Sequence, residues 1–172
     1  DKTGTLTENK MTVAAYELAN GSVEVTGTGL DVDGMFQHGG QELDEPQDPA
    51  MQEALKVGVL CNNASVTEED GEVNVTCDPM EVALLIAGVK GGLDRDDLLE
   101  SLPQTREVSF DPAVKMMATY HDSDGRYTVA VKGAPEAVID SSSRVVTGED
   151  SRELSATERD EWIEKSERMA ED

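Results

Sequence analysis

Four short segments of the sequence contain residue types that could do chemistry or bind a ligand. Two of them could contact a phosphoryl group or another anion, and two could contact an aromatic base. The first, DKTGTLT at residues 1–7, places a carboxylate beside a lysine, a glycine and three threonines. A carboxylate can attack a phosphorus atom when a cation offsets the charge repulsion between them. Lys2 can supply that cation, while Gly4 and the threonine hydroxyls allow close contact with phosphoryl oxygens. This segment therefore combines a carboxylate, an ammonium group and hydroxyl groups that could all contact one phosphoryl group.

Two further segments contain residues that could bind an aromatic base. In CDPMEVALL at residues 77–85, Glu81 can accept a hydrogen bond from an exocyclic amine, or it can complete a helix-capping box that begins at Asp78. In FDPAVKMMATYH at residues 110–121, Phe110 can stack on a base, a contact worth about 1–3 kcal/mol. Because Phe110 also continues an alternating pattern with Val108, an ordinary position in the core is the alternative.

The fourth segment, VKGAPE at residues 131–136, has the layout of an anion-binding turn. Lys132 ends an apolar strand, Gly133 permits close backbone approach, and Pro135 can begin a helix. This order places an ammonium group and free amide groups near one another. The alternative is a solvated lysine before a turn, which is the common environment of a single lysine.

Together these segments resemble the motifs of P-type ATPases. DKTGTLT is similar to the phosphorylation motif of that family, and the other three are similar to segments of its nucleotide-binding domain. The resemblance implies that Asp1 accepts the γ-phosphate of ATP while Lys2, Thr3 and Thr5 help to hold it. It also implies a nucleotide site made of Glu81 at the adenine amino group, Phe110 stacked on adenine, Lys115 and Lys132 along the purine and phosphates, and Gly133 and Ala134 at the pocket wall.

The resemblance also predicts how the chain is divided. Residues 1–9 are expected to be a remnant of the phosphorylation domain, with a hinge near Thr7–Met11, and residues 10–172 to be a nucleotide-binding domain that lacks its last strands. The implied parent is a cation-transporting pump of the calcium- and sodium-pump branch, a membrane protein that carries this domain on its cytoplasmic face. It would use ATP with Mg²⁺, and its phosphorylation, actuator and transmembrane domains would be partners of this one.

Segments resembling TGD and GDGxND, which carry the family's Mg²⁺ ligands and a second lysine, do not occur in the sequence. The chain alone is therefore expected to bind ATP without completing the reaction. We also expect it to be a monomer. Two other interpretations stay open. A haloacid-dehalogenase-type phosphatase shares the aspartyl nucleophile, but it usually has a second Asp where this sequence has Thr3. A non-enzymatic acidic interaction module is the other.

The composition narrows the possible ligands. The 172 residues include 14 Lys and Arg against 37 Asp and Glu, a formal charge of -23 that would repel nucleic acid and anionic lipid. A nucleotide site on such a surface needs locally concentrated cations. Cys61 and Cys77 are too few for a disulfide framework or a zinc site, and His38 and His121 have no partners at metal-ligand spacing. No run of about 18 apolar residues could span a bilayer, and no signal peptide is visible.

The elements that would position these residues predict an α+β fold, an antiparallel β-sheet flanked by helices. We expect a hairpin around Asn20-Gly21, a loop over residues 37–49 and a helix over 50–63. A helix capped by Asp78 should end at Gly91, and a capping box of Ser155 and Glu158 should begin the last helix. The remaining predictions are strands at 11–18, 22–28, 72–76, 105–111, 115–121 and 126–131, a short helix from Pro135 to Ile139, and an exposed sheet edge near the last helix.

Overall fold

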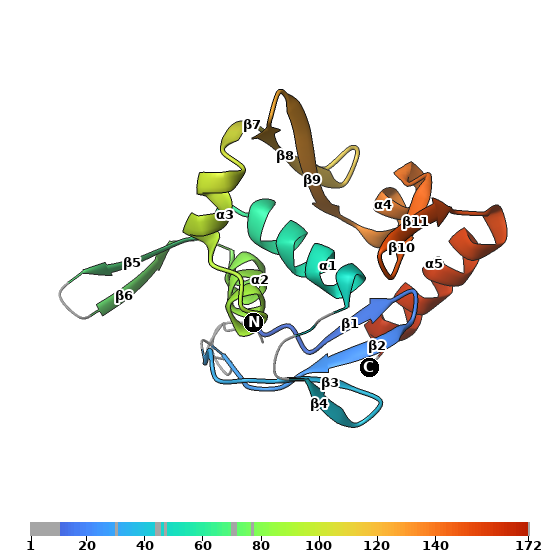
Figure 1. Ribbon diagram of the computed structural model, residues 1–172, viewed down its shortest axis with the longest axis horizontal. Helices are drawn as coiled ribbons and strands as arrows, with labels where there is room; N and C mark the ends of the chain where they lie inside the picture. The colour runs from blue at the N-terminus through green and yellow to red at the C-terminus, as the bar shows by residue number, and fades with distance from the viewer. Residues whose placement is uncertain are drawn as a thin grey trace.

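The computed structural model describes residues 11–29, 31–43, 46, 48–69, 72–76 and 78–171, and of 65–69 and 72–76 it describes the main chain alone. The predictions for Asp1, Lys2, Thr3, Thr5 and the start of the hinge lie outside these residues, as does Cys77. Figure 1 shows α1 (Pro49–Leu60) crossing the middle of the molecule, with one sheet on either side of it.

The first sheet is built from two consecutive hairpins. β1 (Ala15–Leu18), β2 (Gly21–Val25), β3 (Phe36–His38) and β4 (Gln41–Leu43) pair antiparallel in that order. The Asn20-Gly21 hairpin is confirmed, but the loop predicted over 37–49 is wrong in its first part. Gly39 and Gly40 both have positive φ, 58° and 80°, so this glycine pair forms a tight turn between β3 and β4.

Two helices join this sheet to the rest of the molecule. α1 begins after Asp48, whose carboxylate accepts from the amides of Ala50 and Met51. α2 (Pro79–Lys90) begins after Asp78, and its end at Gly91 is as predicted. The helices approach closely at Gly88, where an added Cβ would lie 2.3 Å from Cγ2 of Val59. α1 contributes Met51 and Leu55 to the apolar cluster under the first sheet.

The second sheet is a three-stranded antiparallel meander of β7 (Gln104–Asp111), β8 (Met116–Ser123) and β9 (Arg126–Gly133). All three strands were predicted, with the turn at Asp124-Gly125. Leu60 and Cys61 at the end of α1 pack against Met117 and Ala130 of this sheet. A helix that sequence periodicity did not reveal, α3 (Arg95–Ser101), precedes β7 and is capped by Asp94.

Two further hairpins form sheets of their own. β5 (Ser65–Glu69) and β6 (Glu72–Thr76) extend away from the body in Figure 1, and β10 (Arg144–Thr147) pairs with β11 (Asp150–Glu153). β11 is an edge strand whose four residues are all exposed, and it lies just before the last helix. Pairing between molecules at this edge stays a prediction.

The C-terminal part contains α4 (Pro135–Ser141) and α5 (Ala156–Glu171). The predicted capping box is confirmed, because the amide of Ser155 donates to Glu158 at 3.0 Å and the amide of Glu158 donates to the Ser155 hydroxyl at 3.3 Å. The α+β class with antiparallel strands and flanking helices is also confirmed, although the strands divide among separate sheets. None of the helices in the described ranges has the length and apolar character of a membrane span.

Candidate functional site

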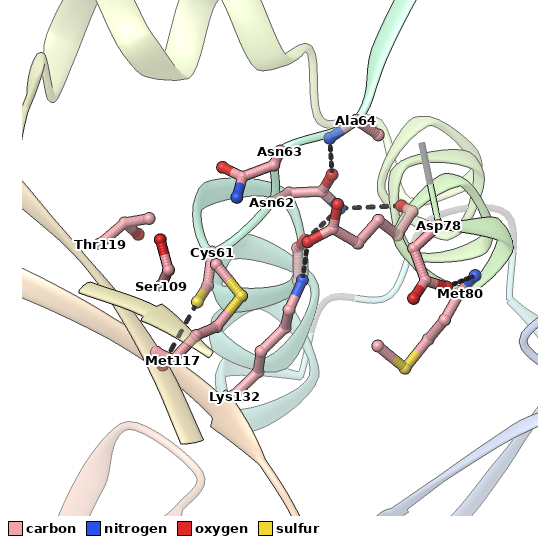
Figure 2. Close-up of polar contacts among 12 residues, drawn as sticks. Cys61, Asn62, Asn63, Ala64, Asp78, Met80, Ser109, Met117, Thr119 and Lys132 are labelled. Atoms are coloured by element: carbon pink, nitrogen blue, oxygen red, sulfur yellow. Dashed lines mark hydrogen bonds and ion pairs between the residues drawn. The ribbon is translucent and has the colours of Figure 1, made fainter. Parts of the chain in front are cut away.

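Lys132 and Glu81 form an ion pair that joins β9 to the first turn of α2. Nζ of Lys132 lies 2.6 Å from Oε1 of Glu81, and the two side chains are only 16% and 10% exposed. Figure 2 shows Lys132 extending from the sheet toward this turn, beside Cys61 and Asn62 at the end of α1. A carboxylate is favoured here by the positive end of the helix dipole as well as by the lysine.

The first turn of α2 has a second carboxylate that performs the capping. The side chain of Asp78 accepts from the amide of Met80 at 2.9 Å, as expected of an N-cap residue. The carboxylate of Glu81 instead faces β9 and Lys132. The Glu81 carboxylate thus pairs with Lys132, and its contact with an adenine amine stays a prediction.

Lys115, Gly133 and Ala134 meet at one end of the three-stranded sheet. Lys115 closes the β7–β8 turn with a positive φ of 53°, and its carbonyl accepts from the amide of Ala134 at 2.9 Å. Gly133 pairs with Met116 and leaves no space for a side chain, since an added Cβ would lie 2.3 Å from the Lys115 oxygen. Glycine at 133 is thus required for the close approach of the two turns.

Lys115 also has a carboxylate partner. Its Nζ lies 2.8 Å from Oε1 of Glu136 in the first turn of α4, and these side chains are 56% and 52% exposed. The hydrogen bond and charge of Glu136 raise the pKa of Lys115, and the hydrogen bond from Lys115 lowers the pKa of Glu136. Both lysines predicted for the site are therefore paired with carboxylates.

Phe110 lies in a β-bulge at the same end of the sheet. Val108 pairs with Ala118 and Asp111 pairs with Met116, so Ser109 and Phe110 together lie opposite Met117 alone. A bulge interrupts the alternation of faces and redirects side chains. Phe110 is 56% exposed, so the alternative of an ordinary core position is wrong.

Three buried side chains that the motifs did not indicate lie behind the ion pair. Asn62 donates to the carbonyl of Glu81, Cys61 lies 3.7 Å from the carbonyl of Met117, and Thr119 donates to the carbonyl of Leu60. Burial raises the pKa of the Cys61 thiol. The only sequence signal for Asn62 was a polar pair, Asn62-Asn63, after an apolar helix. Glu136 lay inside a quoted motif, but its pairing with Lys115 had no local signature.

One histidine, His121, contacts Thr119 of this buried group, and the other, His38, lies on the first sheet. His121 is fully buried, with Nδ1 2.9 Å from the carbonyl oxygen of Leu102 and Nε2 2.9 Å from the Thr119 hydroxyl. His38 is exposed on β3. Within the ranges that the structure describes, no group of three His, Cys, Asp or Glu side chains is arranged to hold a metal ion.

The residues predicted for the site fall into two groups joined by contacts, and Phe110 is placed near one of them by the register of the sheet. β9 and α2 bring Glu81 and Lys132 together, and the β7–β8 turn brings Lys115 to Gly133 and Ala134. Asp111, the residue after Phe110, pairs with Met116 on β8, and Met116 pairs with Gly133 on β9. Phe110 is therefore one residue away from the cross-strand row that contains Gly133. Such a set can hold a flat base that carries an amine and is linked to an anion.

Comparison with known proteins gives an independent assignment. The sequence model of the family described as P-type ATPase, cytoplasmic domain N, matches residues 50–172. The chain is 36% identical to a calcium-transporting ATPase of Bacillus subtilis over 84% of its length, and 35% identical to the cation-transporting ATPase pma1 of Synechocystis over 99%. It is also 32% identical, over 81% of its length, to a probable cation-transporting ATPase F of Mycobacterium tuberculosis.

These relatives are much longer proteins. The matched regions are 16% of the Bacillus ATPase, 19% of the Synechocystis ATPase and 16% of the Mycobacterium ATPase. The chain therefore spans less than a fifth of the length of the curated relatives it matches, in the part that contains the candidate site.

Proposed function

This chain belongs to the P-type ATPase family, as its cytoplasmic domain N, and on that premise we propose that it binds ATP between the first turn of α2 and the bulged end of the β7–β9 sheet. The observation that carries the proposal is the position of Glu81. Its carboxylate points at β9 from the start of α2 and is paired at 2.6 Å with a lysine, instead of serving as a second helix cap.

In the proposed complex, adenine stacks on Phe110 and its exocyclic amine donates to Glu81. Phe110 suits this role because the residue is exposed, with 56% of its surface accessible. Lys115 and Lys132 border the purine and attract the phosphates, which on a chain of net charge -23 need local cations. Gly133 and Ala134 form the wall of the site, where the absence of a Cβ at 133 lets the backbone approach.

The wider role that we propose concerns the longer protein to which this domain would belong. There, ATP held by residues 10–172 would phosphorylate Asp1, with Lys2, Thr3 and Thr5 around the transferred group. Residues 1–9 would belong to the phosphorylation domain and hinge, and the actuator and transmembrane domains would complete a cation-transporting ATPase at the cytoplasmic face of a membrane. The names of the relatives, which are calcium- and cation-transporting ATPases, support this role.

Mg²⁺ would enter such a reaction with the nucleotide. The two carboxylates nearest the site, Glu81 and Glu136, each face a lysine and so are not free as a pair of metal ligands. We therefore propose that Mg²⁺ is held by the phosphates of ATP, where it offsets their charge as they approach Asp1. Lys115 and Lys132 attract the phosphates of this complex from the protein side.

Titration of the ¹⁵N-labelled chain with ATP tests the proposal. Amide shifts should concentrate at Glu81, Phe110, Lys115 and Lys132, with little change near Asp1. Phe110→Ala should weaken ATP binding by about 10- to 100-fold, as expected from loss of one stacked base. Tyr127→Ala is the matched control, because Tyr127 is an exposed aromatic (67%) at the opposite end of the sheet. Equal effects of the two substitutions would contradict the assignment.

The same titration separates the two other functions considered from sequence. A haloacid-dehalogenase-type phosphatase would hydrolyse a phosphate ester without further domains, and an acidic interaction module would bind no nucleotide. The family match over residues 50–172 favours neither. We expect saturable ATP binding with no phosphate release.

A further inference from the structure

Asn62 is fully buried directly behind Glu81, yet neither base stacking nor phosphate contact makes use of it. Its exposed fraction is 0%, and it follows Cys61, the C-cap of α1. A buried primary amide is retained at such a position only when its hydrogen-bonding groups are matched. The contacts of this side chain therefore indicate what it positions.

Each end of the Asn62 amide has partners of the correct type. Nδ2 donates to the carbonyl of Gly58 at 3.0 Å and to the carbonyl of Glu81 at 2.8 Å. Oδ1 accepts from the amide of Ala64 at 2.8 Å. Since carbonyls surround the nitrogen and an N–H faces the oxygen, only one orientation of the amide satisfies the network. The network ties the end of α1 to the first turn of α2.

Arg95 holds the other side of this junction. Its Nη2 donates to the main-chain oxygen of Asn62 at 2.7 Å, and its Nη1 donates to the carbonyl of Ala64. Asn62 is thus fixed in place by α3 while it binds α2. The main chain of Glu81 is held by Asn62, and the carboxylate of Glu81 is held by Lys132.

We propose that Asn62 is a positioning residue that sets the preference of this site for adenine over bases with an oxo group at the same position. This inference rests on the proposed function, in which Glu81 accepts from the adenine amine. A 6-oxo base presents an acceptor to the carboxylate and is repelled. Both the attraction and the repulsion depend on close placement of Glu81, so releasing its main chain weakens the discrimination more than the affinity for the phosphates.

The experiment compares ATP with inosine triphosphate, which replaces the 6-amino group by an oxo group. Dissociation constants of both nucleotides are measured for the wild-type chain and for Asn62→Asp, Asn62→Ala and Glu81→Gln, each confirmed as folded by its amide spectrum. Asn62→Asp has nearly the same shape but places an oxygen against the carbonyls of Gly58 and Glu81. Asn63→Asp is the matched control, because Asn63 is exposed and its side-chain amide donates to Glu107, at 3.0 Å, instead of to α2.

We express the preference as the dissociation constant for inosine triphosphate divided by that for ATP. The Asn62 variants should reduce this ratio by about tenfold, which corresponds to the loss of one hydrogen bond to a charged group. Asn63→Asp should leave the ratio unchanged. In a Glu81→Gln background, the Asn62 substitutions should cause no further loss of discrimination, since Asn62 acts through Glu81. In the wild-type chain, ATP should shift the Asn62 side-chain amide resonances more than inosine triphosphate does, a readout that needs no variant.

The outcomes of this experiment distinguish failure of the inference about Asn62 from failure of the proposed ATP-binding function. Equal weakening of both nucleotides by the Asn62 variants, or a loss that adds to that of Glu81→Gln, would show that Asn62 serves folding alone. Should all Asn62 variants fail to fold, equal shifts of its side-chain amide with the two nucleotides would overturn the inference. A wild-type chain that binds no ATP, or an unchanged ratio in Glu81→Gln, would overturn the proposed function, and this inference with it.

Discussion

The ammonium group of Lys132 lies 2.6 Å from the carboxylate of Glu81, across 51 residues of sequence, and the pair is almost fully enclosed. This contact closes the gap between α2 and β9 at the point where the proposed adenine site begins. It fixes the carboxylate and the ammonium group relative to each other, and fixed groups lose less conformational freedom on binding. Its energetics can be measured separately from binding.

We predict that Lys132→Met destabilises the chain by about 2–4 kcal/mol, because Glu81 would remain as a nearly buried charge without its partner. Urea denaturation measures the change. Lys115→Met is the matched control, since the Lys115–Glu136 pair is more than half exposed and water screens such a pair, so its loss should change stability far less. The double variant Glu81→Gln with Lys132→Met should be more stable than Lys132→Met alone. Additive losses would contradict the coupling.

Gly133→Ala should damage the site through its backbone. An added Cβ would lie 2.3 Å from the carbonyl oxygen of Lys115, so the two turns must separate, at a cost of about 1–3 kcal/mol. Both thermal stability and ATP affinity should fall. Gly58→Ala is the control, because a Cβ there would lie 3.4 Å from Leu84 and alanine favours a helix. A stable Gly133→Ala variant with normal affinity would refute the need for close approach.

Glu136→Gln should strengthen ATP binding by about two- to fivefold, because it removes a carboxylate that competes with phosphate for Lys115. The pKa shifts of the pair, raised for Lys115 and lowered for Glu136, support this competition. The gain should be absent for adenosine, which carries no phosphate, and should decrease with added salt. Glu153→Gln, an exposed substitution on β11, is the control. A similar gain for adenosine would argue against competition at Lys115.

The capping box of α5 should make stability depend on pH in the acid range. Hydrogen bonds from the Ser155 hydroxyl and amide, together with Arg152, lower the pKa of Glu158 from 4.5 to about 2. A carboxyl group whose pKa is lower in the folded state than in the unfolded state stabilises the fold at pH values above its ordinary pKa. This contribution to stability is lost as the pH falls from 4.5 toward about 2. Glu158→Gln should therefore lower Tm by about 1–3 °C at pH 7 and by less at pH 2.5. A constant difference across this range would contradict the shift.

Local chemistry explains which elements could be predicted. Asp78 followed by Pro79, and Ser155 followed by Glu158, determine helix starts through contacts within one turn, and the sequence shows such contacts directly. The hairpin at residues 36–43 and helix α3 were missed for the opposite reason. Strands of three residues and a helix of seven are too short to display a period, so packing determines them.

The same distinction between local contacts and long-range packing applies to the candidate site. The motifs predicted a site of six residues because a nucleotide needs those residue types, namely Glu81, Phe110, Lys115, Lys132, Gly133 and Ala134. They could not indicate the bulge at Ser109 and Phe110, since a bulge depends on the register with Met117 in the neighbouring strand, nor that β7 is exposed along its whole length. They also could not indicate Asn62 or the partner of Lys115, because those contacts join segments far apart in the chain.

The family, the helix caps and the residue types expected at the site could be inferred from short segments, because each of these depends on a few consecutive residues. The structure was needed to show that Glu81 faces Lys132, that Phe110 is exposed, and that a buried amide at Asn62 holds the first turn of α2. Burial and pairing depend on which strands and helices meet. That choice is made by the whole apolar core rather than by any one segment.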